Sequence, residues 1–536
     1  MKRREVLKIS ALGLAAASAS CAGLRNSIRA QSNIKGFYHG VASGDPTNKS
    51  IILWTRATPV SPGPIVCNLE VSLNKNFTNI VFSKKITTTF DTDYCVKYDY
   101  EPNFSFGKNK YFFYRFRGDR LTSDVGRAKL LDDSAKETSF AVMSCSNFPA
   151  GYFNVYEACA YEEIDFWIHL GDYLYEYPMD GYATENAQLL NRIPKPHHEI
   201  LTLSDYRKRH AQYKKDPQSQ LLHATHPLIA VWDDHEITND TWKYGAENHD
   251  ASEGSFLERK SNAIKAYLEW MPIRENTNKR NIYRSFKVGS LLNLVMLDTR
   301  QNNRDKQIDP RNYFSSGQFD MDSFYNDLLN KERKLIGEPQ LSWLADTYGN
   351  SEVAWNIIGQ QVLMTKLKFP DISSALSNSN LSEEVKQYLP LLKLGLPSNL
   401  DAWDGYPAER DRIFSLFKNN NSKLISLAGD THNAWAFNMK NRNGDDFGVE
   451  VAAPGITSPG MESFIPATPE TVEDSLRLSS PEIAYVDASQ RGWAEVTVVP
   501  DSVSARWHYV DTILDRNFKV HRTEPLVCSL GQRRFS

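Results

Sequence analysis

The chain has 536 residues, of which 41% are hydrophobic and 24% are charged, and its formal net charge is −3. A chain of this length predicts two domains with enough residues for a large core. Because no Lys/Arg-rich run occurs outside the amino terminus, the sequence argues against a stable nucleic-acid partner, although a nucleic acid can still be a substrate.

Residues 1–32 have the pattern of an export signal. Lys2-Arg3-Arg4 forms a charged start, and residues 9–19 form a mildly apolar segment that is too short to span a bilayer. The paired arginines favour the twin-arginine export machinery as a partner, with a Sec signal that happens to carry two arginines as the alternative. Cys21 invites a lipoprotein interpretation, but Ser18 is a poor residue three positions before such a cysteine. We therefore expect a free periplasmic or extracellular protein without a membrane-spanning segment.

Residues 33–135 predict an N-terminal β-sandwich domain. Short alternating or β-branched segments, such as residues 50–56 and 110–116, are separated by turn residues. The aromatic side chains of these segments are best explained as a core, and the domain as a packing partner rather than a substrate-binding unit. Cys67 and Cys95 lie in this region and could pair in an oxidising compartment.

Residues 136–512 alternate short apolar runs with helical patterns such as residues 205–213 and 255–270, which predicts an α/β catalytic domain. Six apolar runs end abruptly in polar residues: 140–143, 166–170, 228–232, 291–297, 354–358 and 424–428. Buried strands have such continuous apolar runs, and ligands of open α/β sheets bind beyond the carboxyl ends of the strands. We therefore expect the polar endings to converge. Polar stretches at 177–200, 243–253 and 370–408 predict loops or lids near this crevice, and residues 513–536 an appended C-terminal tail.

The polar endings supply carboxylates, imidazoles, a thiol and a phenol. Such a mixture can hold a pair of divalent or trivalent cations, because oxygen ligands suit calcium, magnesium, manganese or ferric iron and imidazole suits several transition metals. The implied chemistry is metal-assisted hydrolysis. The chain contains no Gly-x-Ser-x-Gly elbow and no Walker-type phosphate loop.

Three motifs, Gly171-Asp172, Asp234-His235-Glu236 and Gly429-Asp430-Thr431-His432, resemble the ligand pattern of the calcineurin-like, purple-acid-type metallophosphoesterases. Within that superfamily the chain is most similar to the PhoD family of secreted alkaline phosphatases and phosphodiesterases, over roughly residues 35–512. The shared motifs are Val41-Ala-Ser-Gly-Asp-Pro46, Ile52-Leu-Trp-Thr-Arg56, Ser144-Cys145, Trp232-Asp-Asp-His-Glu236, Leu297-Asp-Thr-Arg-Gln301 and Ile456-Thr-Ser-Pro-Gly460. The resemblance implies a metallophosphoesterase sandwich of two mixed sheets flanked by helices.

Asp172 follows a glycine at a strand end, where we expect its carboxylate to bridge two metals; a capping aspartate before a helix is the ordinary alternative. Tyr175 lies three residues on, so that a turn can aim both side chains the same way. A phenol, with a reference pKa of about 10, binds only an ion that is acidic enough to remove its proton, and Tyr175 therefore argues for ferric iron. Cys145 alone would be interpreted as a buried packing residue, but the PhoD resemblance implies that it ligates iron.

Asp430 and His432 are expected to bind metal from the same side of an extended turn. Many members of the superfamily have a histidine where Asp430 stands, and the carboxylate suits an oxygen-preferring ion such as calcium. Asp234 and Asn239 are two further candidate ligands, between which the sequence does not decide.

His235 is expected beside the metals, where it would stabilise the phosphoryl group or protonate the leaving oxygen, with Glu236 holding it in place. A structural His–Glu pair is the alternative. Arg300 completes the predicted catalytic set of Asp172, His235 and Arg300. Arg300, Asp298 and the turn at residues 359–361 are candidates for phosphate or supporting contacts, with ordinary packing at strand ends as the alternative.

These residues predict a secreted, metal-dependent phosphoric ester hydrolase that acts on phosphate monoesters or diesters with Fe³⁺ and Ca²⁺ as cofactors. The expected reaction is in-line attack on phosphorus by a metal-activated hydroxide or oxide. A secreted phospholipase of the D type or a wall-polymer phosphodiesterase is the alternative enzyme. A noncatalytic metal- or phosphate-binding protein is a less favoured interpretation, and we expect a monomer.

Overall fold

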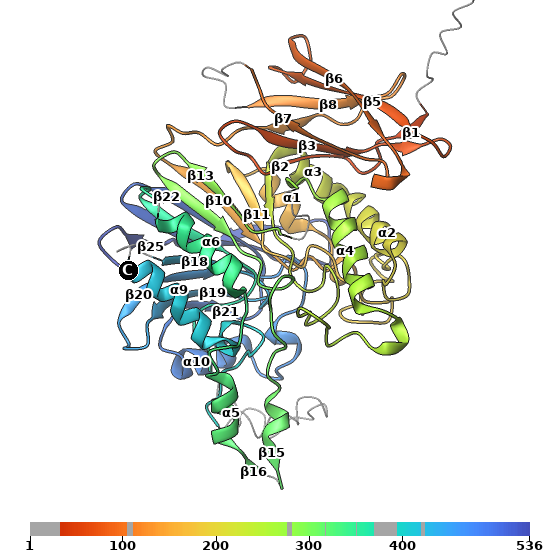
Figure 1. Ribbon diagram of the computed structural model, residues 1–536. Helices are drawn as coiled ribbons and strands as arrows, with labels where there is room; N and C mark the ends of the chain where they lie inside the picture. The colour runs from red at the N-terminus through yellow and green to blue at the C-terminus, as the bar shows by residue number, and fades with distance from the viewer. Residues whose placement is uncertain are drawn as a thin grey trace, which may run out of the picture.

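The computed structural model describes residues 33–103, 111–275, 281–316, 318–349, 351–368, 394–419 and 424–536 (Figure 1). The predicted export signal, residues 1–32, lies outside the described residues, as does the part of the predicted loop at 370–393. Within the described ranges, no helix is long and apolar enough to cross a membrane.

The larger sheet contains ten strands. Its order is β24 (Val520–Arg522), β23 (Ser502–Val510), β22 (Arg491–Val499), β10 (Thr138–Met143), β11 (Phe166–His169), β12 (Leu228–Ala230), β2 (Val41–Gly44), β3 (Ile51–Arg56) and β7 (Cys95–Tyr100), with β25 (Leu526–Ser529) also paired to β23. β10, β11 and β12 are parallel, and Met143, His169 and Ala230 are neighbours in register. Three of the predicted apolar runs therefore end at one edge of this sheet.

The second sheet has seven strands. Its order is β13 (Arg284–Val288), β14 (Leu292–Met296), β17 (Trp355–Gly359), β18 (Leu424–Ala428), β20 (Asp446–Ala452), β19 (Ala434–Lys440) and β21 (Ile483–Asp487). β14, β17 and β18 are parallel and contain the other three apolar runs. All six runs are thus strands, and the predicted mixed α/β class is confirmed.

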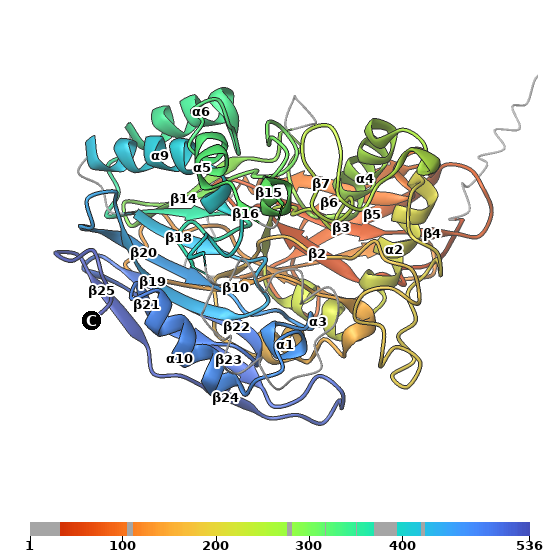
Figure 2. The same ribbon diagram turned by 90° about the horizontal axis from the view of Figure 1, so that it is seen from below.

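The two sheets share one hydrophobic core, to which β10 contributes Phe140, β11 Ile168, β14 Leu294 and β18 Leu427. The other face of the seven-stranded sheet packs against α6 (Gly337–Gly349), α9 (Pro407–Asn419) and α10 (Pro469–Ser479), the first two of which lie side by side in Figure 2. Helices α1 (Asn154–Ala160), α2 (Leu203–Lys214), α3 (Pro217–Thr225) and α4 (Phe256–Trp270) add residues to the shared core. Continuous apolar strands are therefore buried on both faces.

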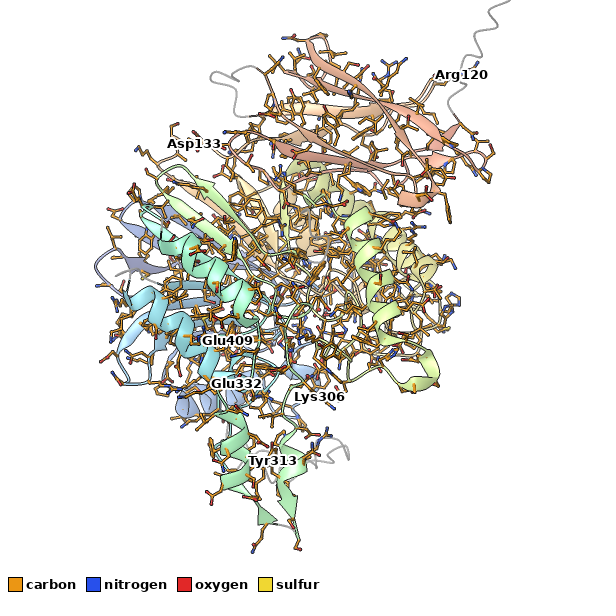
Figure 3. All side chains as sticks on the ribbon, viewed as in Figure 1. Arg120, Asp133, Lys306, Tyr313, Glu332 and Glu409 are labelled. Carbon is orange, nitrogen blue, oxygen red and sulfur yellow. The ribbon has the colours of Figure 1, made fainter. Side chains whose placement is uncertain are left out.

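Glu409 of α9, labelled in Figure 3, explains where α6 begins. Its carboxylate accepts the backbone N–H groups of Leu335, Ile336 and Gly337 at 2.6, 2.9 and 3.0 Å. The first N–H groups of a helix have no partner within the helix, so a buried carboxylate at that end stabilises it.

The N-terminal strands belong to two sheets. A four-stranded sheet has the order β6 (Ile80–Thr88), β5 (Ile65–Ser72), β8 (Phe112–Arg117) and β9 (Gly126–Ala128), and the small pair is β1 (Ile34–Gly36) with β4 (Thr58–Pro59). β2, β3 and β7 share a core with these strands but are hydrogen bonded into the ten-stranded sheet. The domain limit near residue 135 stays a prediction. The ten-stranded sheet crosses this limit, because β2, β3 and β7 precede residue 135 and join the sheet through β12, which follows it.

Cys67 and Cys95 do not form the disulfide that the sequence allowed. Cys67 lies in β5 and packs in the core of the N-terminal strands, whereas Cys95 lies in β7 and packs with Trp54 and Trp270. Both thiols are free and buried. The two cysteines point into different cores, which is why they do not meet.

Two further segments complete the fold. β15 (Phe314–Ser315), β16 (Gln318–Phe319) and α5 (Met321–Leu328) form a projection that carries Tyr313, with Lys306 and Glu332 nearer the body of the molecule (Figure 3). The segment predicted as a tail, residues 513–536, supplies β24 and β25 to the ten-stranded sheet and buries Phe535.

Candidate metal centre

Polar loops after β10, β11 and β18 meet at the carboxyl ends of the strands. The backbone N–H of Cys145 donates to the Gly171 carbonyl oxygen at 3.1 Å, and the N–H of Ser146 donates to the Asp172 carbonyl oxygen at 2.9 Å. The N–H of Ile456 donates to the Ser144 carbonyl oxygen at 3.1 Å, which adds the loop after β20, and the N–H of Gly455 in that loop donates to the His432 carbonyl oxygen at 3.0 Å, which adds the loop after β18. The predicted convergence of the polar endings is therefore observed for these loops.

Four residues in these loops have left-handed backbone conformations: Cys145, Asp172, Asp430 and His432 have φ angles of 63°, 55°, 65° and 61°. Such angles are uncommon for residues with a Cβ and cost about 1–3 kcal/mol each. Strain of this kind persists where the surrounding structure requires it, and it collects at functional sites. All four residues were predicted from the sequence to bind metal.

Gly171 is required next to Asp172. Its φ is +116°, and a Cβ added there would lie 2.3 Å from the Cβ of Asp233. Only glycine lets the loop after β11 pass so close to the loop after β12, and this approach brings Asp172 to the carboxylates of that second loop.

Cys145, Tyr175 and His432 form what we call the thiol cluster, beside Asp172. The possible ligand atoms of Cys145, Asp172 and His432 all lie within 4.8 Å of one another. The Tyr175 hydroxyl donates to Asp172 Oδ2 at 3.0 Å and lies 3.3 Å from His432 Nε2. His432 Nδ1 donates to the Pro459 carbonyl oxygen at 2.7 Å, so Nε2 is the nitrogen left to bind a metal.

Two residues hold Tyr175 in this position. The Ser458 hydroxyl donates to the Tyr175 hydroxyl oxygen at 2.7 Å. The buried Arg209 of α2 donates to the carbonyl oxygens of Tyr175 and Tyr177, the latter at 3.0 Å. The backbone of the loop is therefore fixed to a helix while its phenol is fixed to the loop after β20.

Asp234, Asp401 and Asp430 surround the Arg300 guanidinium and form what we call the carboxylate cluster. Arg300 Nη1 lies 2.7 Å from Asp401 Oδ2, and Nη2 lies 3.8 Å from Asp234 Oδ1 and 3.6 Å from Asp430 Oδ1. Arg300 Nε is also paired with Asp233. The structure thus places Arg300 among carboxylates, and its Nη2 is buried without a hydrogen-bond partner among the described residues.

Asp172 lies between the two clusters. Its possible ligand atoms are also within 4.8 Å of those of Asp234 and His235. Within the described part of the chain, Asp172 Oδ1 and Asp234 Oδ1 are buried oxygens without a hydrogen-bond partner. A buried carboxylate oxygen without a donor is costly, and a cation would satisfy it.

The electrostatics of the centre also fit bound cations. Burial raises the pKa of the Cys145 thiol well above its usual range, and the Asp172 carboxylate adds to the shift. Burial raises the pKa of Asp430 to about 7, although Arg300 opposes the shift. These groups bind a metal only when deprotonated, and a bound cation would favour that form by offsetting the negative charge.

His235 is held by Glu176, not by Glu236 as the sequence suggested. His235 Nδ1 lies 2.7 Å from Glu176 Oε2, and the His235 ring centroid lies 4.2 Å from that of Tyr175. Burial of the ring opposes protonation, but the carboxylates of Glu176, Asp234 and Asp172 raise the pKa of His235 well above its usual range. The sequence prediction failed because Glu236 is adjacent in the chain but faces the other way.

Glu236 instead ties two loops together. Its carboxylate accepts the backbone N–H groups of Asp172, Tyr173 and Asp233 at 3.2, 2.6 and 2.7 Å. This buried carboxylate therefore fixes the loop after β11 against the loop after β12.

The remaining predicted residues have supporting contacts. The Asn239 side-chain amide donates to Glu247 Oε2 at 3.0 Å, and its backbone N–H donates to Glu176 at 2.8 Å. Asp298 accepts the backbone N–H groups of Arg300 and Gln301, and Gln361 accepts both the N–H and the hydroxyl of Thr299. Asp298 and Gln361 thus shape the turn that carries Arg300.

Sequence reasoning assigned no individual role to Glu176, Asn399, Asp401 or Ser458. Asn399 Nδ2 lies 3.5 Å from Asp430 Oδ2, and Asp401 pairs with Arg300. Glu176 directly follows the candidate ligand Tyr175, and Ser458 lies within the motif of residues 456–460. Asn399 and Asp401 lie in the polar stretch 370–408, which was predicted to lie near the crevice but gives no signal for individual residues.

Comparisons with known proteins agree with this geometry. The profile of a family described as PhoD-like phosphatase matches residues 140–507, and that of the PhoD-like phosphatase N-terminal domain matches residues 21–132. Alkaline phosphatase D of Bacillus subtilis (strain 168) is 30% identical over 498 residues, which cover 89% of this chain and 78% of that protein. A solved structure described as "Structure of PhoD" has a TM-score of 0.77 and 28% identity, over 94% of this chain and 92% of that one.

Proposed function

The chain belongs to the PhoD-like phosphatase family, and we propose that it is an exported, metal-dependent phosphoric ester hydrolase. Family membership implies hydrolysis of phosphate esters. The observation that carries the proposal of metal dependence is Asp172, whose buried carboxylate is close to the possible ligand atoms of two groups of side chains.

Two ions of different chemistry suit the two clusters. Ferric iron would be held by the thiol cluster and Asp172, because thiolate, phenolate and imidazole groups meet there. Calcium would be held by Asp172, Asp234 and Asp430, because hard cations prefer carboxylate oxygens. Asn239 stays a prediction as a further ligand, since its amide contacts Glu247. When bound, the two cations would make water a better nucleophile and neutralise charge on the phosphoryl oxygens.

His235 would act as the acid that protonates the leaving oxygen. Glu176 binds Nδ1, so Nε2 is the nitrogen available to an ester. The Glu176 carboxylate favours the protonated ring, which can both donate the proton and offset charge on the phosphoryl group.

Arg300 would orient the phosphoryl group. Its guanidinium is fixed by Asp233 and Asp401, and the buried Nη2 without a hydrogen-bond partner in the described chain is the donor available for a phosphate oxygen. Guanidinium groups bind phosphate through directional, charge-assisted hydrogen bonds, so this donor would hold the ester in one orientation.

Export rests on the sequence of residues 1–32. The charged start with paired arginines followed by a short apolar segment is typical of twin-arginine signals. We propose a periplasmic or extracellular location on this basis. It is tested by fusing residues 1–32 to a reporter and comparing the native arginines with Arg3→Lys and Arg4→Lys together; loss of export in the double variant supports the proposal, and unchanged export refutes the twin-arginine route.

The test of the hydrolase is a comparison of aryl phosphate monoester and diester cleavage by the purified protein. Asp172→Ala is the informative variant, and Asp474→Asn on α10 is the matched control, because the Asp474 side chain is 78% exposed. We expect cleavage by the native protein and the control and its loss in Asp172→Ala. The relative rates on the two esters rank monoester against diester. Equal activity of Asp172→Ala and the native protein would refute the proposed role of Asp172.

A further inference from the structure

Three aromatic side chains lead from His235 toward solvent. The Tyr177 ring lies 5.4 Å from the His235 ring and 5.7 Å from the Tyr182 ring, measured between centroids. The Tyr182 and Phe464 rings are 6.5 Å apart, with their planes within 6° of parallel. We call Tyr177, Tyr182 and Phe464 the aromatic row.

The inner part of the aromatic row is fixed to the metal centre. The Tyr182 hydroxyl donates to the Pro459 carbonyl oxygen at 3.1 Å and lies 3.3 Å from His432 Nδ1. The Tyr177 carbonyl oxygen accepts from the buried Arg209 at 3.0 Å. The positions of both tyrosines are therefore set by groups that also position Tyr175 and His432.

The outer end of the row is open. Phe464 follows the short helix η6 (Met461–Ser463), and its side chain is 54% exposed. Burying a phenylalanine side chain is favourable relative to leaving it exposed, so a ligand that covered the Phe464 ring would gain from the contact. Because it parallels the Tyr182 ring beside a candidate metal ligand, Phe464 presents a flat apolar face near the centre.

The aromatic row begins beside His235, and this position indicates that it would contact the leaving group of the substrate. Glu176 binds His235 Nδ1, so a leaving oxygen that takes a proton from His235 must approach Nε2. Tyr177 and Tyr175 are the rings beside His235, and Tyr177 leads on to Tyr182 and Phe464. Groups attached to the leaving oxygen therefore have an aromatic surface to follow toward solvent.

We propose that the aromatic row is a leaving-group subsite that selects phosphate esters whose leaving group carries a flat ring. This inference rests on the proposed hydrolase function and on His235 as its acid. In the reaction, water forms the new bond to phosphorus and loses a proton, the bond between phosphorus and the leaving oxygen breaks, and the leaving oxygen takes a proton from His235, which regains one from the water. The ring of the departing alcohol stacks on Tyr182 and Phe464.

The test compares benzyl and ethyl esters of phosphate, whose alcohols are of similar basicity, so that the ring is the main difference. For each ester, kcat/KM is measured for the native protein, Phe464→Ala, Phe464→Tyr and Phe90→Ala. Phe90 is the matched control, because it is a 67% exposed phenylalanine in the turn between β6 and β7. Circular dichroism checks that each variant is folded.

We expect Phe464→Ala to lower kcat/KM for the benzyl ester by about fivefold, mainly through KM, because a stacked ring contributes about 1 kcal/mol, which is about fivefold. The ethyl ester should change by less than about twofold, since it has no ring to stack. Phe464→Tyr should restore the benzyl value, and Phe90→Ala should leave both esters at the native rate.

Two other outcomes separate the inference from the proposed function. Equal changes for the two esters in Phe464→Ala, or no change for either, would overturn the leaving-group subsite while leaving the hydrolase intact. If the native protein cleaved neither of these two esters and also failed to cleave aryl phosphate esters, both the leaving-group subsite and the hydrolase function would be overturned.

Discussion

The thiol cluster and the carboxylate cluster meet at Asp172 but differ in chemistry. In the thiol cluster, sulfur, phenol and imidazole groups are held by neutral partners, the Ser458 hydroxyl and the Pro459 carbonyl oxygen. In the carboxylate cluster, acidic side chains surround the buried Arg300 guanidinium. Asp172 therefore lies between a group of sulfur, phenol and imidazole donors and a group of carboxylate oxygen donors.

This difference supports the proposal that the centre holds two unlike ions. Thiolate and phenolate ligands suit a strongly Lewis-acidic transition metal, whereas carboxylates suit calcium or a similar hard cation. Arg300 also gives the carboxylate cluster a fixed positive charge of its own. The two clusters should therefore respond differently to substitution, and only a change at Asp172 should affect both.

Asp172→Ala should have the largest effect. Removing the shared carboxylate should lower the content of both ions and reduce hydrolysis by at least about a hundredfold. Elemental analysis of the purified variant beside Asp474→Asn checks the expectation. If only one ion were lost, Asp172 would belong to one cluster and the bridging role would be wrong.

Glu176→Gln should have the next largest effect, without loss of either ion. The variant removes the charge that holds His235, so esters with poor leaving groups should slow by about tenfold to a hundredfold. Esters of p-nitrophenol, which need little protonation of the leaving oxygen, should slow much less. The rates on alkyl and p-nitrophenyl esters check this, with Glu338→Gln on α6 as control; equal slowing on both esters would show that Glu176 only supports the structure.

Tyr175→Phe should have the smallest effect on hydrolysis and a specific effect on colour. A phenolate bound to ferric iron absorbs visible light, so the variant should lose that band while it keeps calcium. Tyr313→Phe on the projection, where the hydroxyl contacts Asp327, is the matched control. A visible spectrum that is unchanged in Tyr175→Phe would remove Tyr175 from the proposed iron ligands.

Much of the fold and centre could be predicted because buried parallel strands have a simple sequence pattern. Continuous apolar runs gave β10, β11, β12, β14, β17 and β18, and the polar residues after several of them met at the sheet edge. This rule and the family resemblance predicted Cys145, Asp172 and His432 as metal ligands. In the structure their possible ligand atoms lie within 4.8 Å of one another.

The details that failed depend on contacts that no local pattern encodes. Glu236 is next to His235 in the sequence, but it is Glu176 that contacts the His235 ring in the structure. The irregular conformations of the loops decide which of the two carboxylates reaches the ring. The contacts of Asp401 with Arg300 join residues about a hundred positions apart, and the pairing of β2 with β12 joins more distant segments. Periodicity identifies elements and their faces, but it does not specify such partners.

The most direct test of two unlike ions is elemental analysis of Cys145→Ser and Asp430→Asn beside the native protein. Cys159→Ser is the control, because Cys159 is a buried thiol in α1. We predict that Cys145→Ser loses iron and keeps calcium, that Asp430→Asn loses calcium and keeps iron, and that the control keeps both. Loss of the same ion in both variants, or a fully active native protein without iron, would contradict the account.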